Sequence, residues 1–290
     1  PILVLLETVK QTKNLTMGPQ TSIIGGEIYE TIYTPKSYIF QFFIDRFPIF
    51  LICLTFISIF FIFFDKDYFR KKYNLFFLKF FSNFIIIFFP IFLIILLNVT
   101  LYDDLRLLIF LLPFYSLIPA LGFIYLIDNF SKNFYGKLLL FISIILFGLF
   151  FDRFLKLTPY QYDYSNYFKI RFSDTKNEYQ HDFWGTSYKE LIKKTLKNEK
   201  FLNSNYTISN CGGDLFQIQN EFIKNEKIRK NRNVKFIKTT SASKAEYIIM
   251  INRLGNGKFK KEKCFDYFKG EDIFSVERLG VKYSVLRKIN

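Results

Sequence analysis

The sequence predicts a polytopic α-helical membrane block followed by a small α/β or α+β domain, and two observations lead to this fold class. Half of the 290 residues are hydrophobic, with 40 Phe among them, yet 40 Lys and Arg stand against 25 Asp and Glu. The charged residues are unevenly distributed along the chain. Residues 1–151 hold 12 basic and 9 acidic residues, whereas residues 152–290 hold 28 basic and 16 acidic residues. We therefore expect a helical region over 37–155 and a basic domain over 156–290.

The composition also excludes several classes of protein. So much apolar surface excludes a disordered chain. Three cysteines are too few for a disulfide scaffold. A single His argues against a multi-His metal site and against a Ser–His–Asp enzyme contained in this chain.

Uncharged apolar runs in the first half are long enough to cross a bilayer, which requires about 18 residues or more. A fourth run, of about 14 residues, is short for a span and could instead be a buried or interfacial helix. Lys137 can snorkel at its start, and Phe154 and Leu155 extend its end, so we take it as a fourth span. The four runs are 47–64, 80–97, 107–127 and 138–151.

The connecting loops predict the orientation of these spans. Loops 65–74 and 128–137 are basic, whereas 98–105 carries two acids and no base. Positive loops stay in the cytoplasm, and long translocated domains largely escape this rule. Segment 1–36 and the domain 156–290 are therefore expected outside the cytoplasm.

The N-terminus carries no basic signal-peptide region and begins with Pro1. Because segment 1–36 is expected outside, something upstream should translocate it. We therefore expect the chain to be the C-terminal part of a longer membrane protein.

The second half alternates helical and extended patterns, which is typical of an α/β or α+β domain. Ser187 and Glu190 form a capping-box pattern before the first helix. The last two strands flank Leu279-Gly280 as a hairpin. Helices are expected over 188–200 and 214–227, and strands over 206–209, 234–238, 247–252, 273–278 and 281–286.

Two of the cysteines, Cys211 and Cys264, fall in this domain. Outside the cytoplasm they could form a disulfide, and two unpaired thiols remain the alternative. Cys53 lies within the first apolar run and is expected to face lipid or a neighbouring helix.

Three stretches, 101–106, 158–166 and 182–190, lie at the outer ends of spans or in the outer domain; they read LYDDLR, TPYQYDYSN and DFWGTSYKE. Together they resemble the C-terminal half of bacterial membrane glycosyltransferases of the protein-mannosyltransferase-like type. These belong to the GT-C superfamily and use polyprenyl-phosphate-linked sugars. The resemblance runs from about Glu27 to the C-terminus and implies a hexosyltransferase.

The chain departs from this family at three motif positions. Leu107 and Thr158 stand where the family usually has His, and Asp104 replaces Gly. The family's catalytic acids lie in a first outer loop near the N-terminus, a region that this chain lacks. The resemblance therefore implies that the chain supplies part of the active-site wall, with the catalytic base upstream.

Such a transferase needs a carboxylate base for the acceptor hydroxyl and cations for the departing phosphate. Arg106 ends a short outer loop at the membrane boundary, where a guanidinium can bind a lipid phosphate, although it could merely anchor the helix. Asp103 and Asp104 could hold a divalent cation or orient Arg106; a solvated carboxylate pair is the interpretation we favour. No other cofactor or metal is expected. The predicted donor-binding set is Tyr102, Asp103, Asp104 and Arg106.

The other two stretches supply candidates for acceptor binding or domain docking. Tyrosines there suit sugar stacking, but Tyr is also the ordinary interfacial anchor, which we favour. Trp184 could either seat the domain on the membrane block or form a sugar platform, and His181 is expected at the surface. The candidates are Tyr160, Gln161, Tyr162, Asn166, Asp182 and Trp184.

The expected partners are membrane lipid, a polyprenyl-phosphate-sugar donor, and a protein, lipid or glycan acceptor. Lys-rich runs at 193–200, 224–232 and 258–263 would suit nucleic acid, but the predicted location argues against that partner. The competing class is a non-enzymatic, membrane-anchored binding or scaffolding module outside the cytoplasm.

Overall fold

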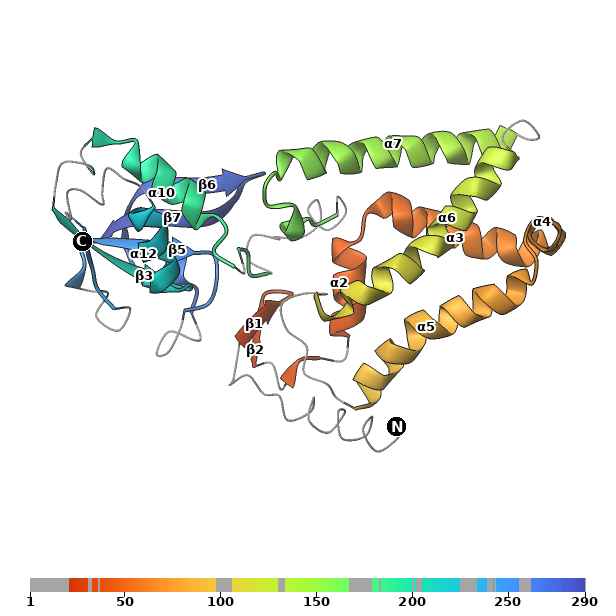
Figure 1. Cartoon of the computed structure of the whole chain (residues 1–290), viewed down its shortest axis with the longest axis horizontal. Helices are drawn as coiled ribbons and strands as arrows, with labels where there is room; N and C mark the ends of the chain where they lie inside the picture. The colour runs from red at the N-terminus through yellow and green to blue at the C-terminus, as the bar shows by residue number, and fades with distance from the viewer. Residues whose placement is uncertain are drawn as a thin grey trace. The chain divides into compact units, whose positions relative to one another are not determined.

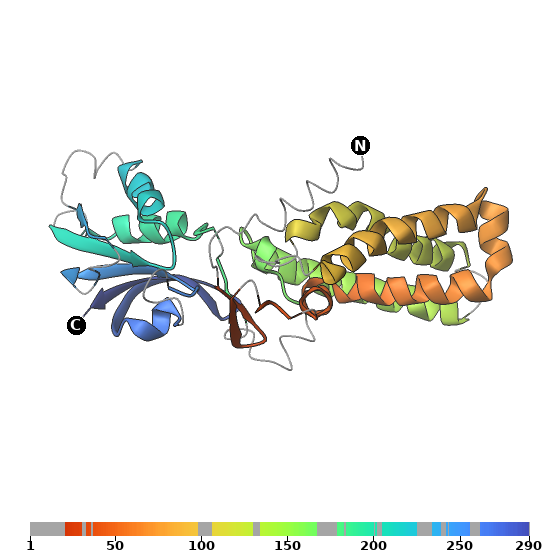
Figure 2. The ribbon, with the colours of Figure 1, turned by 90° about the horizontal axis from the view of Figure 1, so that it is seen from below.

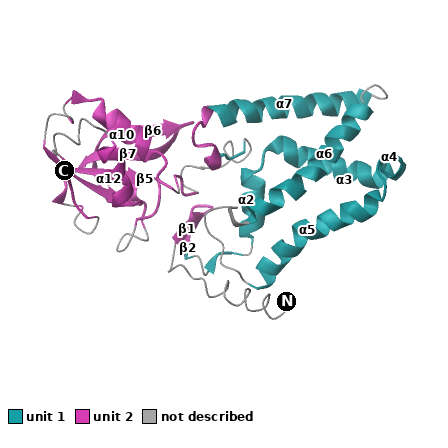
Figure 3. Ribbon diagram, in the orientation of Figure 1, with its two compact units in different colours: residues 1–20, 30–155, 164–173 teal, residues 21–29, 156–163, 174–290 magenta. Residues whose placement is uncertain are grey.

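The computed structural model describes thirteen stretches of the chain, and of Arg106 and Leu107 it describes the backbone alone. The chain divides into two units (Figure 3): unit 1 comprises 1–20, 30–155 and 164–173, and unit 2 comprises 21–29, 156–163 and 174–290. The described residues are 21–30, 33–35, 37–97, 106–129, 134–166, 179–182, 184–199, 201, 205–224, 234–238, 242, 244–255 and 262–289.

Unit 1 is helical and has the character of a membrane protein. Three helical stretches are long and apolar enough to cross a bilayer: Phe76–Leu96, Leu108–Asp128 and Phe134–Lys156. A fourth candidate is a pair of helices bent by 108° at a short break. The helices (Figure 1) are α2 (Tyr38–Arg46), α3 (Ile49–Phe64), α4 (Lys66–Lys72), α5 (Phe76–Leu96), the 3₁₀ helix η2 (Arg106–Leu111), α6 (Leu112–Asp128) and α7 (Phe134–Lys156).

The fourth predicted span proves longer than its uncharged run. The run 138–151 lies inside the 23-residue α7, because the helix continues through Lys137 on one side and Asp152 and Arg153 on the other. Similarly, α5 begins at Phe76 and includes Lys79, earlier than the predicted start at Phe80. Charged residues at helix ends therefore hid the true lengths of these helices.

The break between α2 and α3 follows from Pro48. The residue before a proline is pushed towards extended geometry, and Phe47 has φ −80° and ψ 140°. Asn166 donates to three backbone carbonyls around this break. Its side-chain amide donates to Ile44 and Phe47, and its backbone N–H donates to Asp45. The carbonyls at the end of α2 are thereby satisfied.

Helices α3 and α6 approach closely at Gly122. A Cβ at this position would lie 2.7 Å from the backbone oxygen of Leu54 and 3.0 Å from the nitrogen of Ser58, which is fully buried. Nearby, the hydroxyls of Thr55 and Tyr115 are 2.9 Å apart. A small residue therefore sets the contact between these two apolar helices.

Unit 2 is built on a five-stranded mixed sheet. Its order is β4-β3-β5-β7-β6, in which β3 is parallel to β4 and β5, while β7 is antiparallel to β5 and β6. A separate two-stranded sheet joins β1 (Thr21–Ile24) and β2 (Glu27–Glu30). The remaining elements are β3 (Tyr206–Cys211), β4 (Val234–Phe236), β5 (Tyr247–Ile251), β6 (Gly270–Arg278), β7 (Val281–Ile289), α10 (Tyr188–Leu196), α12 (Leu215–Ile223) and α14 (Cys264–Tyr267).

The central strand β5 is buried on both faces. Tyr247, Ile249 and Ile251 join the apolar cluster formed with α10 and α12, whereas Ile248 and Met250 join the cluster of the opposite face, which contains Cys264. Figure 2 shows α10 and α12 on one side of the sheet and α14 on the other. This two-sided burial explains the unbroken apolar run of the strand.

The predicted helices and strands of 188–286 are confirmed, with shorter helices and longer final strands. The β1–β2 hairpin was not predicted, although Gly25-Gly26 between two extended runs is a turn signal. The predicted capping box is wrong. Ser187 precedes α10 but forms no side-chain cap, because its hydroxyl donates to Asp182.

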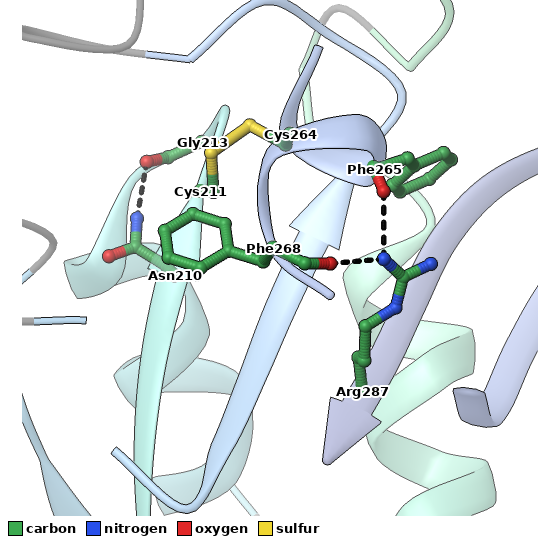
Figure 4. Close-up of a disulfide and its surroundings, with 7 residues drawn as sticks. All are labelled: Asn210, Cys211, Gly213, Cys264, Phe265, Phe268 and Arg287. Atoms are coloured by element: carbon green, nitrogen blue, oxygen red, sulfur yellow. Dashed lines mark hydrogen bonds between the residues drawn. A yellow bond between two sulfur atoms is a disulfide. The ribbon is translucent and has the colours of Figure 1, made fainter. Parts of the chain in front are cut away.

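Of the two alternatives left open for Cys211 and Cys264, the structure has the disulfide (Figure 4). Both residues are fully buried. The bond ties the end of β3 to α14, and Arg287 holds the same helix through the backbone oxygens of Phe265 and Phe268.

Candidate functional site

The predicted donor-binding set falls outside what the structure describes. Tyr102, Asp103 and Asp104 lie outside the described residues, and Arg106 contributes only its backbone, as the first residue of η2. Its role as a phosphate-binding residue stays a prediction.

The stretch that follows α7 is built into unit 2, starting with Tyr160. This residue is 1% exposed, its hydroxyl donates to Glu190 at 2.9 Å, and its ring stacks on that of Tyr283 at 4.7 Å. Arg278 donates to Glu190 at 2.7 Å and to the backbone oxygen of Thr158 at 3.2 Å. The interfacial-anchor interpretation of Tyr160 is therefore wrong, because both ring and hydroxyl are used inside the unit.

The carboxylate of Glu190 is held in its ionised form. Burial alone raises its pKa, but hydrogen bonds from Arg278, Tyr160 and Lys194 outweigh burial and lower it. The result is a charge-assisted cluster between the start of α10 and the end of β6.

Asp182 is the centre of a second buried cluster. Its Oδ1 accepts from the hydroxyls of Tyr162 at 3.0 Å and Thr186 at 2.9 Å, and its Oδ2 accepts from both the backbone N–H and the hydroxyl of Ser187. Asp182 is fully buried and has φ +58°, a conformation that Asp tolerates better than most residues. Burial raises the pKa of this carboxyl, while the hydrogen bonds oppose the shift.

A third cluster joins Asp163 and His181. The Nδ1 atom of His181 lies 2.6 Å from Oδ2 of Asp163, which also accepts from the hydroxyl of Tyr283 at 2.8 Å. The backbone N–H of His181 donates to Asn252 at the end of β5. His181 is 2% exposed, so its predicted place at the surface is wrong. At this depth the imidazole orders the fold and is closed to a substrate.

The two remaining polar candidates of 158–166, Gln161 and Asn166, belong to different units. Gln161 donates to the hydroxyl of Thr158 at 2.7 Å, a local contact. Asn166 is buried in unit 1, where it bonds to the α2–α3 break. Nearby, Arg46 donates to the hydroxyl of Ser165 at 2.9 Å. The stretch therefore contributes its first half to unit 2 and its second half to unit 1.

Trp184 is the most exposed of the described acceptor-binding candidates, at 55% exposure. Its backbone oxygen accepts from the side chain of Gln217 at 3.0 Å, which fixes the loop against α12. Phe216, on the same helix, is 65% exposed, and Tyr162 is 41% exposed. The two interpretations of Trp184, as a residue that seats the domain on the membrane block and as a sugar platform, both stay predictions.

Open α/β sheets often bind ligands where the connections from adjacent parallel strands diverge to opposite faces. In unit 2 this point lies at the carboxyl ends of β3 and β5, which lead to α12 and α14. The chain fills it with its own groups: a Cβ on Gly212 would lie 3.0 Å from Ile251 and 3.1 Å from the sulfur of Cys264. Across it, Arg253 donates to Gln180 at 3.1 Å. Among the described residues, the ends of β3 and β5 are therefore closely packed around Gly212.

Among the described residues, no group of three or more His, Cys, Asp or Glu side chains is arranged to hold a metal ion. Asp103 and Asp104, for which a cation site was the less favoured alternative, lie outside that set. Comparison with protein-family models, curated proteins and solved structures finds no match to this chain.

Proposed function

We propose that this chain is part of an integral-membrane glycosyltransferase that moves a sugar from a polyprenyl-phosphate donor to an acceptor outside the cytoplasm. One observation carries the proposal. The stretches 158–166 and 182–190, on which the family resemblance rests, bond to each other through Tyr162 and Asp182 and through Tyr160 and Glu190. The two stretches on which the resemblance rests therefore lie side by side in unit 2, which supports reading them as one site.

In this proposal, Arg106 binds the donor phosphate at the membrane boundary, assisted by Tyr102, Asp103 and Asp104. The acceptor meets the exposed aromatic side chains of Trp184 and Tyr162. The catalytic base comes from an acidic loop elsewhere in the protein. Unit 2 lies outside the cytoplasm of a bacterium, which the disulfide between Cys211 and Cys264 supports, because such bonds persist in oxidising compartments.

The test uses the protein expressed from its complete reading frame in membrane vesicles supplied with radiolabelled polyprenyl-phosphate hexoses. Labelled product should form, and Arg106→Ala should reduce its formation at least about a hundredfold, the scale on which loss of a charge-stabilising group acts. Lys193→Ala, which removes an exposed cation of α10, is the matched control and should leave transfer unchanged. Absence of product with every donor, or full activity of Arg106→Ala, would contradict the proposal.

A second candidate is a non-enzymatic binding or scaffolding module anchored in the membrane. One observation favours it. The carboxylates of Asp163 and Asp182 accept hydrogen bonds from side chains of unit 2, so these two acids stabilise the fold. The two functions are separated by the same assay, because a scaffold would capture a partner while producing no labelled glycan.

A further inference from the structure

A basic turn joins two apolar helices of unit 1. Helix α4 carries Lys66, Arg70 and Lys71 on its exposed surface. It lies between α3 and α5 (Figure 1). The last residue of α3, Phe64, is 76% exposed, and Leu78 in the first turn of α5 is 65% exposed. The chain thus passes from exposed apolar side chains to exposed cations and back within a few residues.

These cations are not neutralised by the acids around them. Asp128 accepts from the hydroxyl of Tyr68 at 2.5 Å and from the ammonium group of Lys72, so Lys72 is not counted among the exposed cations. Asp65 accepts from the hydroxyl of Tyr125 at 3.0 Å and caps α4. Within the described part of the chain, Lys66, Arg70 and Lys71 form no ion pair; Asp67 is the one exposed acid of α4, so these three cations and one carboxylate leave a net charge of +2 on its exposed surface.

Helix α4 is held in place by packing. Its Phe69 is fully buried, and the ring of Phe69 packs 5.0 Å from that of Phe76 and 5.7 Å from that of Tyr125. Arg70 lies over the ring of Phe77 at 5.2 Å, which restrains its guanidinium. The backbone of α4 and the guanidinium of Arg70 are therefore positioned before any ligand arrives, which lowers the entropy cost of binding.

We infer that Lys66, Arg70 and Lys71 of α4 form a binding surface for the headgroups of anionic phospholipids. The occupant follows from what surrounds the surface. Helices of membrane-spanning length and composition place the ends of α3 and α5 where a bilayer ends. Phosphodiester headgroups are the anions concentrated at that depth, and clusters of Lys and Arg next to spans attract them. The inference is independent of sugar transfer and would survive its failure.

The test reconstitutes the protein in phosphatidylcholine vesicles with spin-labelled phosphatidylglycerol or phosphatidylcholine as the probe. Electron paramagnetic resonance gives the fraction of each lipid immobilised by the protein. The protein should prefer phosphatidylglycerol. The Lys66→Gln/Arg70→Gln/Lys71→Gln variant should lower that preference by at least about fivefold, roughly the attraction of a single cation near an anionic surface.

Two control variants keep the test decisive. Lys189→Gln/Lys193→Gln/Lys197→Gln removes the same charge from exposed positions around α10 and should retain the preference. Lys66→Arg/Lys71→Arg keeps the charge of α4 and should also retain it. An unchanged preference in the α4 triple variant, its loss in either control, or its displacement by inorganic phosphate at constant ionic strength would overturn the inference.

Discussion

Removal of the disulfide should weaken unit 2 without changing its fold. Cys211 and Cys264 are 53 residues apart, and a cross-link of this span removes about 4 kcal/mol of unfolded-state entropy at 25 °C. Helix α14 would remain attached, since the backbone N–H of Cys264 donates to Arg253 and Arg287 binds the oxygen of Phe265. The free energy of unfolding should therefore fall while the native contacts persist.

The perturbation is Cys211→Ala/Cys264→Ala, which leaves no unpaired thiol at either site. Urea unfolding of the detergent-solubilised protein, followed by pulse proteolysis of unit 2, gives the midpoint. With a slope of about 2 kcal/mol/M, a loss of about 4 kcal/mol lowers the midpoint by about 2 M. Reduction of the wild-type protein should give a similar decrease.

The matched control is Cys53→Ala in α3, because Cys53 is the free cysteine of the chain and should leave the midpoint of unit 2 unchanged. A double variant that unfolds within about 0.3 M of wild type would refute the reasoning. So would a wild-type midpoint that does not respond to reductant.

The remaining predictions concern packing and charge. Tyr188→Phe should leave stability unchanged or raise it by up to about 1 kcal/mol, because the buried hydroxyl has no hydrogen-bond partner among the described residues; a clear loss by urea titration would contradict this. Gly213→Ala should cost about 2 kcal/mol or more, since its Cβ would lie 1.9 Å from that hydroxyl, and Tyr188→Phe should partly restore the urea midpoint. In unit 1, Gly122→Ala should cost about 1–3 kcal/mol in thermal unfolding, whereas Gly148→Ala, with nothing within 4 Å, should not. The lowered pKa of Glu190 means that its stabilisation is present above its unfolded pKa of about 4.5 and is lost as pH falls through the folded pKa; Glu190→Gln should flatten that acid limb of the stability profile. The raised pKa of Asp182 has the opposite effect on stability. The free energy of unfolding should decline as pH rises from about 4 through the folded pKa, and Asp182→Asn should remove this decline.

Local patterns predicted much of the architecture. Apolar runs indicated the long apolar helices of unit 1, and the β-rich run 247–252 indicated the strand found at Tyr247–Ile251. Both signals depend on the order of residues within a single element, so the sequence carries them directly. The errors at α5 and α7 arose because charged residues at helix ends do not stop a helix, and the run lengths counted only uncharged residues.

The candidate site was predicted less well, because its chemistry depends on distant partners. Motif residues such as Asp182 were identified, but Tyr160 and His181 were assigned to exposed positions although both are buried. Arg278 and Tyr283 were missed. Neither belongs to a local motif. Arg278 bonds to Glu190, 88 residues away in the chain, and Tyr283 bonds to Asp163, 120 residues away.

The sequence by itself determined that an apolar helical part and a basic α/β part share one chain, because hydrophobic length and charge distribution are properties of composition. Only the tertiary structure decided what the polar residues do. The sheet order places β7 beside β5, and this brings Tyr283 to Asp163 and His181 to the end of β5. A buried polar group must find a partner, and which partner it finds is set by how the strands pack.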